Sequence, residues 1–174
     1  MKRAAFLDRD GTLNVQPPPH QYVTDVRDLE LIPGAIEGAA QLAAAGYLLA
    51  VVSNQRGLAR GLLDEAVLGS IEGVIQEELA AHGARIEAFR YCPHDLDTGC
   101  DCRKPRPGML LELAEELGVD LGSSWMIGDS GTDVEAGALV CCRTALIGDD
   151  AGDLRPDVTA PSLATVAPLV LARS

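Results

Sequence analysis

The chain has 174 residues and a formal net charge of −12 at pH 7; 47% of its residues are hydrophobic and 23% are charged. This length and balance predict a single folded domain over residues 1–174 and exclude a disordered chain. The acidic charge excludes nucleic acid as a partner, and no apolar run reaches the about 20 residues that span a bilayer. We therefore expect a cytoplasmic monomer without a membrane partner.

Short apolar runs alternate with helical patterns along the chain. The apolar runs predict strands at residues 3–7, 48–53, 86–91, 124–127 and 143–147. Apolar residues at helical spacing predict helices at 34–45, 64–81 and 109–117. Because strands and helices alternate, we predict an α/β fold with a mostly parallel sheet. Ligands of such sheets bind at the carboxyl ends of the strands.

Two carboxylates follow the first predicted strand, in Asp8-Arg9-Asp10. Residues two apart on an extended segment point the same way, so Asp8 and Asp10 should converge on one site while Arg9 points elsewhere. Carboxylates that lie this close repel each other, and a divalent cation relieves the repulsion. Their hard oxygen ligands favour Mg²⁺.

Polar residues also follow two other predicted strands. The second strand is followed by a hydroxyl, two amides and a guanidinium, and the fourth by two carboxylates: Ser53, Asn54, Gln55, Arg56, Asp129 and Asp133. Together these strand ends predict an acid-rich metal site beside hydrogen-bond donors and cations. Such a site suits phosphoryl transfer, in which one Asp is the covalent nucleophile and another transfers protons.

A cysteine-rich segment, CPHDLDTGCDC, precedes Arg103 and Lys104. Its four ligand-type side chains would occupy all four coordination positions of a tetrahedral Zn²⁺ and leave none for water. This predicts a structural zinc site made of Cys92, His94, Cys100 and Cys102. Bound zinc would brace the loop and hold Arg103 and Lys104 toward the strand ends. The chain has five cysteines, and this odd number predicts reduced thiols instead of a disulfide framework.

Several other residues carry less information. We expect Cys141 and Cys142 to be core residues, and we assign no function to His82 or Arg60. For His20, in the segment QPPPHQYV, the sequence leaves open whether the side chain contacts a ligand.

The segments FLDRDGTLN, VVSNQRGLARG, CDCRKPRPGM and MIGDSGTD, in this order, resemble the haloacid dehalogenase superfamily of aspartyl phosphatases. Within it they are most similar to the branch of D,D-heptose 1,7-bisphosphate phosphatases and histidinol phosphatases. The resemblance implies a three-layer Rossmann-like fold with a zinc-binding loop. The short segments after the first two motifs leave no room for the cap domain of many relatives.

The resemblance also implies roles for the acidic residues. Asp8 would be the nucleophile that becomes an aspartyl phosphate, and Asp10 the general acid and base. Mg²⁺ would be held by the Asp8 carboxylate, the Asp10 backbone carbonyl and Asp129. Asp133 would orient Lys104 or a metal-bound water from a second layer.

Other side chains would contact the substrate. Ser53 would hydrogen-bond the transferring phosphoryl group and Lys104 would pair with its charge. The remaining substrate-binding residues would be Asn14, Tyr22, Asn54, Gln55, Arg56 and Arg103.

The resemblance implies that the substrate is a small phosphorylated sugar, D-glycero-D-manno-heptose 1,7-bisphosphate, and that its C7 phosphate is removed. Histidinol phosphate is the alternative substrate, and a phospho-accepting receiver or a zinc-dependent binding module is the alternative kind of protein. One difference bears on substrate choice: Ser130 follows Asp129 where the heptose enzymes commonly have a lysine. One cation near the metal and the phosphate is therefore missing.

Overall fold

The computed structural model describes residues 2–148 and 151–173. Within this part of the chain, six strands form one sheet: β1 (Arg3–Leu7), β2 (Tyr47–Asn54), β3 (Ile86–Cys92), β4 (Trp125–Gly128), β5 (Arg143–Ile147) and β6 (Val158–Ala160). Their order is β3-β2-β1-β4-β5-β6, and all neighbouring strands are parallel. The predicted α/β fold with a mostly parallel sheet is confirmed.

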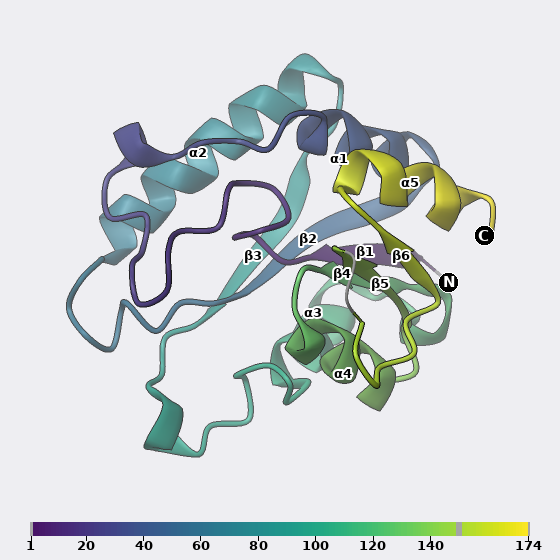
Figure 1. Cartoon of the computed structure of the whole chain (residues 1–174). Coiled ribbons are helices and arrows are strands. Elements are labelled where there is room, and N and C mark those ends of the chain that lie inside the picture. Colours follow the sequence, from purple (N-terminus) through teal and green to yellow (C-terminus); the bar gives the residue numbers. More distant parts are fainter. Residues whose placement is uncertain (1, 149–150, 174) are drawn as a thin grey trace.

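Helices cover both faces of the sheet, which gives the predicted three layers. They are α1 (Ala35–Ala44), α2 (Glu65–Ala81), α3 (Gly108–Leu117), α4 (Gly131–Leu139) and α5 (Leu163–Leu171), with short 3-10 helices η1 (Val26–Asp28), η2 (Leu96–Thr98) and η3 (Leu121–Ser123). Figure 1 shows α1, α2 and α5 on one face and α3 with α4 on the other. None of the helices in the described ranges is long and apolar enough to cross a membrane.

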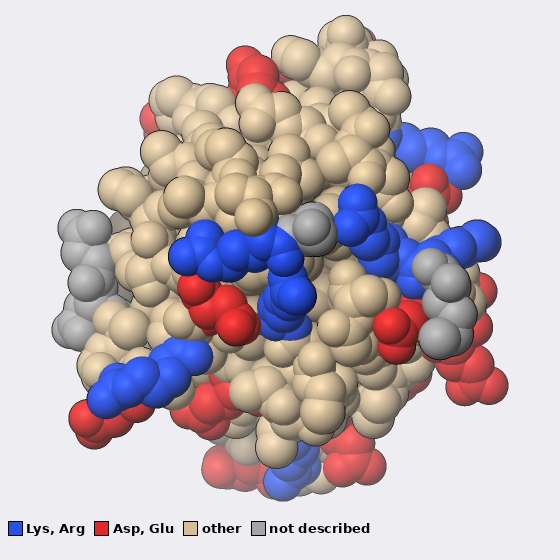
Figure 2. Space-filling model, turned by 90° about the vertical axis from the view of Figure 1, so that its right-hand side faces the viewer, with Lys and Arg blue, Asp and Glu red and all other residues tan. Residues whose placement is uncertain are grey.

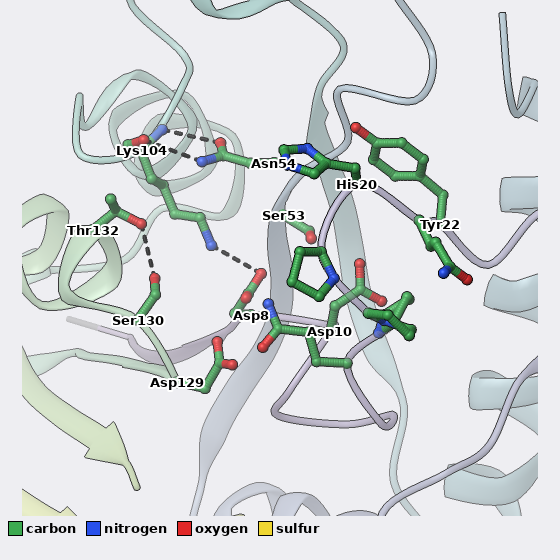
Figure 3. A pocket seen from close by; sticks show the side chains of 15 residues that line it. Asp8, Asp10, His20, Tyr22, Ser53, Asn54, Lys104, Asp129, Ser130 and Thr132 are labelled. Atoms are coloured by element: carbon green, nitrogen blue, oxygen red, sulfur yellow. Dashed lines mark hydrogen bonds and ion pairs between the residues drawn. The ribbon is translucent and has the colours of Figure 1, made fainter. Parts of the chain in front are cut away.

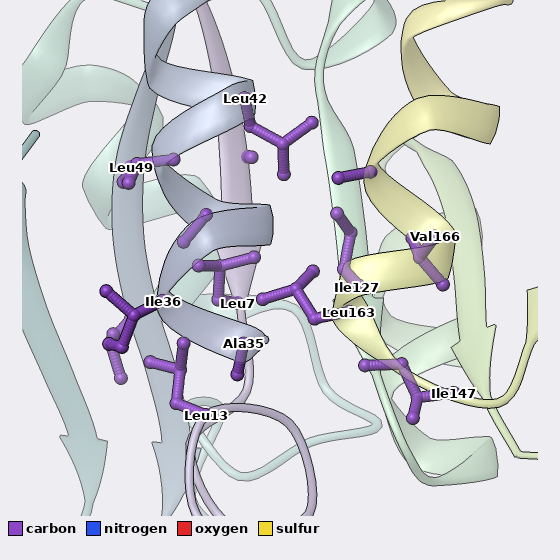
Figure 4. Close-up of a cluster of buried hydrophobic side chains, with 14 of the residues drawn as sticks. Leu7, Leu13, Ala35, Ile36, Leu42, Leu49, Ile127, Ile147, Leu163 and Val166 are labelled. Carbon is purple, nitrogen blue, oxygen red and sulfur yellow. The ribbon is translucent and has the colours of Figure 1, made fainter. Parts of the chain in front are cut away.

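Two hydrophobic cores explain the continuous apolar runs of the strands. In β1, Ala5 and Leu7 pack into the core beneath α1, α2 and α5, whereas Ala4 and Phe6 pack into the core beneath α3 and α4. Successive side chains of a strand point to opposite faces, so a strand covered on both faces is apolar throughout. Figure 4 shows the first of these cores, where the side chain of Leu163 extends from α5 toward α1.

The sequence did not predict α4, α5 or β6. The α4 helix contains two glycines, which are poor helix formers, and Gly137 is needed because a Cβ there would lie 2.7 Å from the Cβ of Met126. The α5 helix contains Pro168, and β6 has only 3 residues. In each case tertiary packing outweighs a weak local signal.

Over residues 2–148 and 151–173, no cap domain covers the carboxyl ends of the strands, as predicted. The loop of residues 8–34 and the loop of residues 55–64 are described throughout, and η1 is the only helix within them. In the described part of the chain, the carboxyl ends of β1 and β2 are therefore bordered by loops without a further domain.

The opposite edge of the sheet is rich in cations. Arg3 Nη2 donates to the carbonyl of Ala45, which caps α1, at 2.8 Å, and Arg143 Nη1 donates to the carbonyl of Arg173, beyond α5. Figure 2 shows Lys and Arg side chains gathered on the face that carries both termini. Carboxyl ends of helices carry partial negative charge, which these cations balance.

Candidate active site

A pocket of about 220 Å³ opens at the carboxyl ends of β1, β2 and β4. We call it the main pocket; Figure 3 shows the side chains around it. It is lined by Asp8, Asp10, Gln16, Pro17, Pro18, Pro19, His20, Gln21, Tyr22, Ser53, Asn54, Lys104, Asp129, Ser130 and Thr132. The predicted strand ends thus come together, with Tyr22 from the loop after β1 and Lys104 from the loop after β3.

Three carboxylates form a cluster at the base of this pocket. Oxygen atoms of Asp8, Asp129 and Asp133 lie within 4.8 Å of one another. Two glycines make room for them: a Cβ on Gly11 would lie 2.0 Å from Asp129 Oδ2, and a Cβ on Gly128 would lie 2.1 Å from Asp133 Oδ2. Gly11 also has a φ of +84°, which side chains rarely allow.

Lys104 is the cation of this cluster. Its Nζ lies 2.9 Å from Asp8 Oδ1, 2.6 Å from Asp133 Oδ1 and 2.7 Å from the carbonyl oxygen of Val52. Burial lowers the pKa of Lys104, but the carboxylates of Asp8 and Asp133 outweigh this effect and raise it overall. The buried side chain is therefore an ammonium ion.

The cluster still carries excess negative charge. Burial raises the pKa of Asp8 to about 6; Lys104 opposes this shift and Asp133 adds to it. Burial also raises the pKa of Asp129 to about 7, with a further contribution from the charges of Asp8 and Asp133. Three carboxylates thus face one ammonium, and a divalent cation would balance the remainder. The oxygen donors of Asp8 and Asp129 suit Mg²⁺.

Asp10 lies apart from this cluster and is held by three side chains. Arg9 donates from Nε (3.1 Å) and Nη2 (2.9 Å) to Asp10 Oδ1 and from Nη2 to Oδ2 (3.0 Å). Asn14 Nδ2 donates to Oδ1 at 2.9 Å and Gln55 Nε2 to Oδ2 at 2.8 Å. Asn14 and Gln55 are fully buried, so they contact Asp10 and do not line the main pocket.

The prediction that Arg9 points elsewhere was wrong. Its side chain is fully buried and returns to Asp10. The alternation of an extended strand ends at Leu7, because the carbonyl of Arg9 accepts hydrogen bonds from the N–H groups of Leu13 and Asn14 in a tight turn. Sequence reasoning missed this contact, since it assumed strand geometry beyond the last strand residue.

The residues at the end of β2 have different surroundings. Ser53 Oγ accepts a hydrogen bond from Gln55 Nε2 at 3.1 Å and lines the main pocket. The Asn54 side chain bonds both backbone groups of Lys104. Arg56 Nε pairs with Asp95 Oδ1 at 2.5 Å and does not line the main pocket.

A second cavity, of about 450 Å³, adjoins the main pocket and shares Asn54, Lys104 and Thr132 with it. Arg103 lines this cavity and donates from Nη1 to the carbonyl of His94 at 3.4 Å. The two cavities together form a connected surface around Lys104.

The four predicted zinc ligands lie together. Cys92 Sγ is 3.6 Å from His94 Nδ1, 3.7 Å from Cys100 Sγ and 3.3 Å from Cys102 Sγ. Zn–S bonds of about 2.3 Å and Zn–N bonds of about 2.0 Å place tetrahedral ligand atoms roughly 3.5 to 3.8 Å apart. The donor set fits zinc; the two distances from Cys102 Sγ, 3.3 Å to Cys92 Sγ and 3.2 Å to His94 Nδ1, are somewhat shorter than this spacing. Burial, with the neighbouring thiols, raises the pKa of Cys102 to about 12, and a metal would reverse this by stabilising the thiolate.

Ser130 stands at the amino end of α4. It forms a capping box in which its N–H and Oγ donate to Asp133 Oδ2 at 3.1 and 2.8 Å. The sequence pattern Ser-x-x-Asp could have predicted this helix start. Thr132, which sequence reasoning did not identify as a site residue, lines the main pocket, and its Oγ1 lies 2.8 Å from Ser130 Oγ.

Known proteins are similar to this chain in sequence and in fold. The HAD-hydrolase-like family model matches residues 101–166. The D-glycero-β-D-manno-heptose-1,7-bisphosphate 7-phosphatase of Pseudomonas aeruginosa is 43% identical over 142 residues, which are 82% of this chain and 79% of the relative. The enzyme of the same name from Yersinia pestis is 36% identical over 183 residues, covering 98% and 96%.

The solved structures agree with the sequence relatives. The crystal structure of D,D-heptose 1,7-bisphosphate phosphatase from B. bronchiseptica, complexed with magnesium and phosphate, superposes with a TM-score of 0.89 at 34% identity and covers 100% of both chains. The corresponding enzyme from Burkholderia thailandensis has a TM-score of 0.72 at 28% identity, covering 98% of this chain and 99% of the other.

Proposed function

The chain belongs to the D-glycero-D-manno-heptose-1,7-bisphosphate 7-phosphatase family of haloacid dehalogenase-like hydrolases, and from this membership we propose that it removes the C7 phosphate of that sugar bisphosphate in an Mg²⁺-dependent reaction. The observation that carries the proposal is the contact of Lys104 Nζ with Asp8 Oδ1 inside a three-carboxylate cluster at the base of an open pocket. The proposed enzyme is a cytoplasmic monomer with one domain, residues 1–174.

Asp8 is the proposed nucleophile. One of its carboxylate oxygens attacks the phosphorus atom, the bond between phosphorus and the C7 oxygen breaks, and the leaving oxygen takes a proton from the Asp10 carboxyl group. In the second step Asp10 takes a proton from a water molecule that attacks the aspartyl phosphate. The bond between phosphorus and the Asp8 oxygen then breaks, which releases inorganic phosphate and restores both residues.

The residues around Asp10 support its proposed role. Arg9, Asn14 and Gln55 fix the orientation of the Asp10 carboxyl group, which lines the main pocket. Asp10 also lies outside the cluster of Asp8, Asp129 and Asp133. Two carboxyl groups in different surroundings can serve as nucleophile and as acid and base.

The metals have separate proposed tasks. Asp8, Asp129 and the Asp10 backbone carbonyl would hold Mg²⁺, which balances the charge of the phosphoryl group when bound. Cys92, His94, Cys100 and Cys102 would hold a structural Zn²⁺. Ser53 and Lys104 face the main pocket and would contact the phosphoryl oxygens there.

Phosphate release tests the proposal. The wild-type protein, Asp8→Asn and Glu37→Gln, an exposed carboxylate on α1, would be assayed with Mg²⁺ on both anomers of heptose 1,7-bisphosphate and on histidinol phosphate. We expect heptose bisphosphate to be the better substrate, Asp8→Asn to be inactive and Glu37→Gln to match the wild type. Preference for histidinol phosphate would contradict the substrate. A stable phosphoprotein without turnover would indicate a receiver, and full activity of Asp8→Asn would exclude the mechanism.

A further inference from the structure

His20 lies at the rim of the main pocket in a backbone conformation that favours glycine. Its φ is 66°, and Cys141 is the only other non-glycine residue of the described chain with a positive φ. Gln21 N–H donates to the carbonyl of Pro18 at 2.9 Å, so residues 18–21 form a β-turn with Pro19 second and His20 third. Proline second and positive φ third are the features of a type II turn, whose third residue is usually glycine.

A histidine at this turn position adds an imidazole ring to the rim of the pocket, whereas the usual glycine has no side chain. His20 is exposed, and Figure 3 shows its ring extending from the loop toward the side of the pocket that carries Asn54. Pro17, Pro18 and Pro19 line the same wall, but prolines have no backbone N–H and offer a substrate no hydrogen-bond donor. Their fixed φ angles also stiffen the segment that presents His20.

The charges in the pocket show what this ring could bind. Of the described side chains that line the pocket, only Lys104 and His20 can carry positive charge, against three carboxylates, those of Asp8, Asp10 and Asp129. Contacts with Asp8, Asp133 and the carbonyl of Val52 hold the Lys104 ammonium beside the proposed nucleophile, where it faces the transferring phosphoryl group and not a second phosphate. No side chain or backbone group in the described ranges bonds the His20 ring, so its donors are available to a ligand.

We propose that His20 is a specificity-determining residue whose imidazole N–H donates a hydrogen bond to the phosphate that a sugar bisphosphate retains after cleavage. The inference rests on the proposed function and adds a contact that the catalytic residues do not supply. An imidazole has an N–H donor in both protonation states, and hydrogen bonds to a charged phosphate are stronger than those between neutral groups.

The variant His20→Gly separates binding from folding. Glycine suits the left-handed conformation, so we expect the Tm of this variant to equal or exceed that of the wild type. With heptose 1,7-bisphosphate we expect kcat/KM to fall roughly tenfold or more, chiefly through KM. With heptose 7-phosphate, which lacks the second phosphate, we expect kcat/KM to change by less than about twofold.

A second histidine provides the matched control. His82 caps the carboxyl end of α2, is exposed, and does not line the main pocket, so His82→Gly should leave the kinetics of both substrates unchanged. Provided that the wild type is active, two results for His20→Gly would overturn the inference: an equal loss of kcat/KM for both substrates, or no loss of kcat/KM for the bisphosphate. If the wild type cleaved neither substrate, the proposed function would fail first and the inference with it.

Discussion

The Asn54 side chain holds both backbone polar groups of Lys104: the Lys104 N–H donates to Asn54 Oδ1 at 3.1 Å, and Asn54 Nδ2 donates to the Lys104 carbonyl at 3.1 Å. Asn54 is the last residue of β2, so the sheet itself anchors the loop that carries the buried lysine. Asn54, expected from the sequence to bind substrate, thus also positions Lys104.

Replacing Asn54 by Ala should therefore lower activity through Lys104. Loss of the two hydrogen bonds should reduce the free energy of unfolding by about 1–3 kcal/mol and kcat/KM by roughly tenfold to hundredfold. The control is Gln76→Ala, because Gln76 makes the same pair of bonds to the backbone of Ile86, at 2.8 and 2.9 Å, outside the main pocket. In urea unfolding, we expect both variants to lose a similar amount of stability. In steady-state kinetics, we expect Gln76→Ala to keep full activity and Asn54→Ala to lose it.

The ion pairs of Lys104 should be strongly coupled. Lys104→Met leaves the Asp8 and Asp133 carboxylates buried without their cation, which should cost about 3–5 kcal/mol of unfolding free energy. Asp133→Asn in the same chain should recover part of this loss, because it removes one of the two stranded charges. Urea unfolding of the two single variants and the double variant measures the coupling; additive losses, within about 0.5 kcal/mol, would disprove it.

Zinc should be needed for the order of the loop that leads to Lys104. Cys100→Ser removes one of four ligands, so we expect zinc content to fall from roughly one ion per chain to a small fraction, with a lower Tm and reduced kcat/KM. Cys141→Ser is the control, because Cys141 lies outside the ligand set and is exposed; the prediction that it is a core residue was wrong, whereas Cys142 is buried. Metal analysis by mass spectrometry checks the result, and unchanged zinc in Cys100→Ser would refute the site.

The stability of the protein without added Mg²⁺ should depend on pH through Asp129. Its pKa is raised from 3.8 to about 7 by burial and then by nearby carboxylates, so the folded state binds this proton more tightly than the unfolded chain. The free energy of unfolding of the wild type, relative to Asp129→Asn, should rise by about 1 kcal/mol or more as pH falls from about 7 to about 5. Chemical unfolding at both pH values measures this difference, and a fall would contradict the assignment.

The sequence predicted the strands well where both faces are buried. Residues 3–7 and 143–147 match β1 and β5 to the residue, because an apolar run of this length is too short for a typical helix and favours a strand. It could not predict β6, whose 3 residues gain their order from pairing with β5 at the edge of the sheet. Local patterns are weakest where tertiary contacts decide.

The sequence predicted most residues of the site but not the contacts between their side chains. Acidic residues after two strands indicated a metal site, but spacing alone could not place Lys104 against Asp8, 96 residues away. The zinc loop predicted only that Lys104 lies toward the strand ends, and the family resemblance implied that it pairs with the phosphoryl group; neither predicted its contact with Asp8. The pairing of Arg9 with Asp10 followed from neither source, since it depends on the turn that begins where β1 ends.

The separation of Asp8 and Lys104 along the chain also affects how the protein folds. Bringing together residues 96 positions apart costs loop-closure entropy, which is recovered only after distant strands have paired. The helices can form from neighbouring residues, but the acidic cluster needs β1 beside both β2 and β4. During refolding, helical circular dichroism should therefore return before catalytic activity, which reports completion of the parallel sheet.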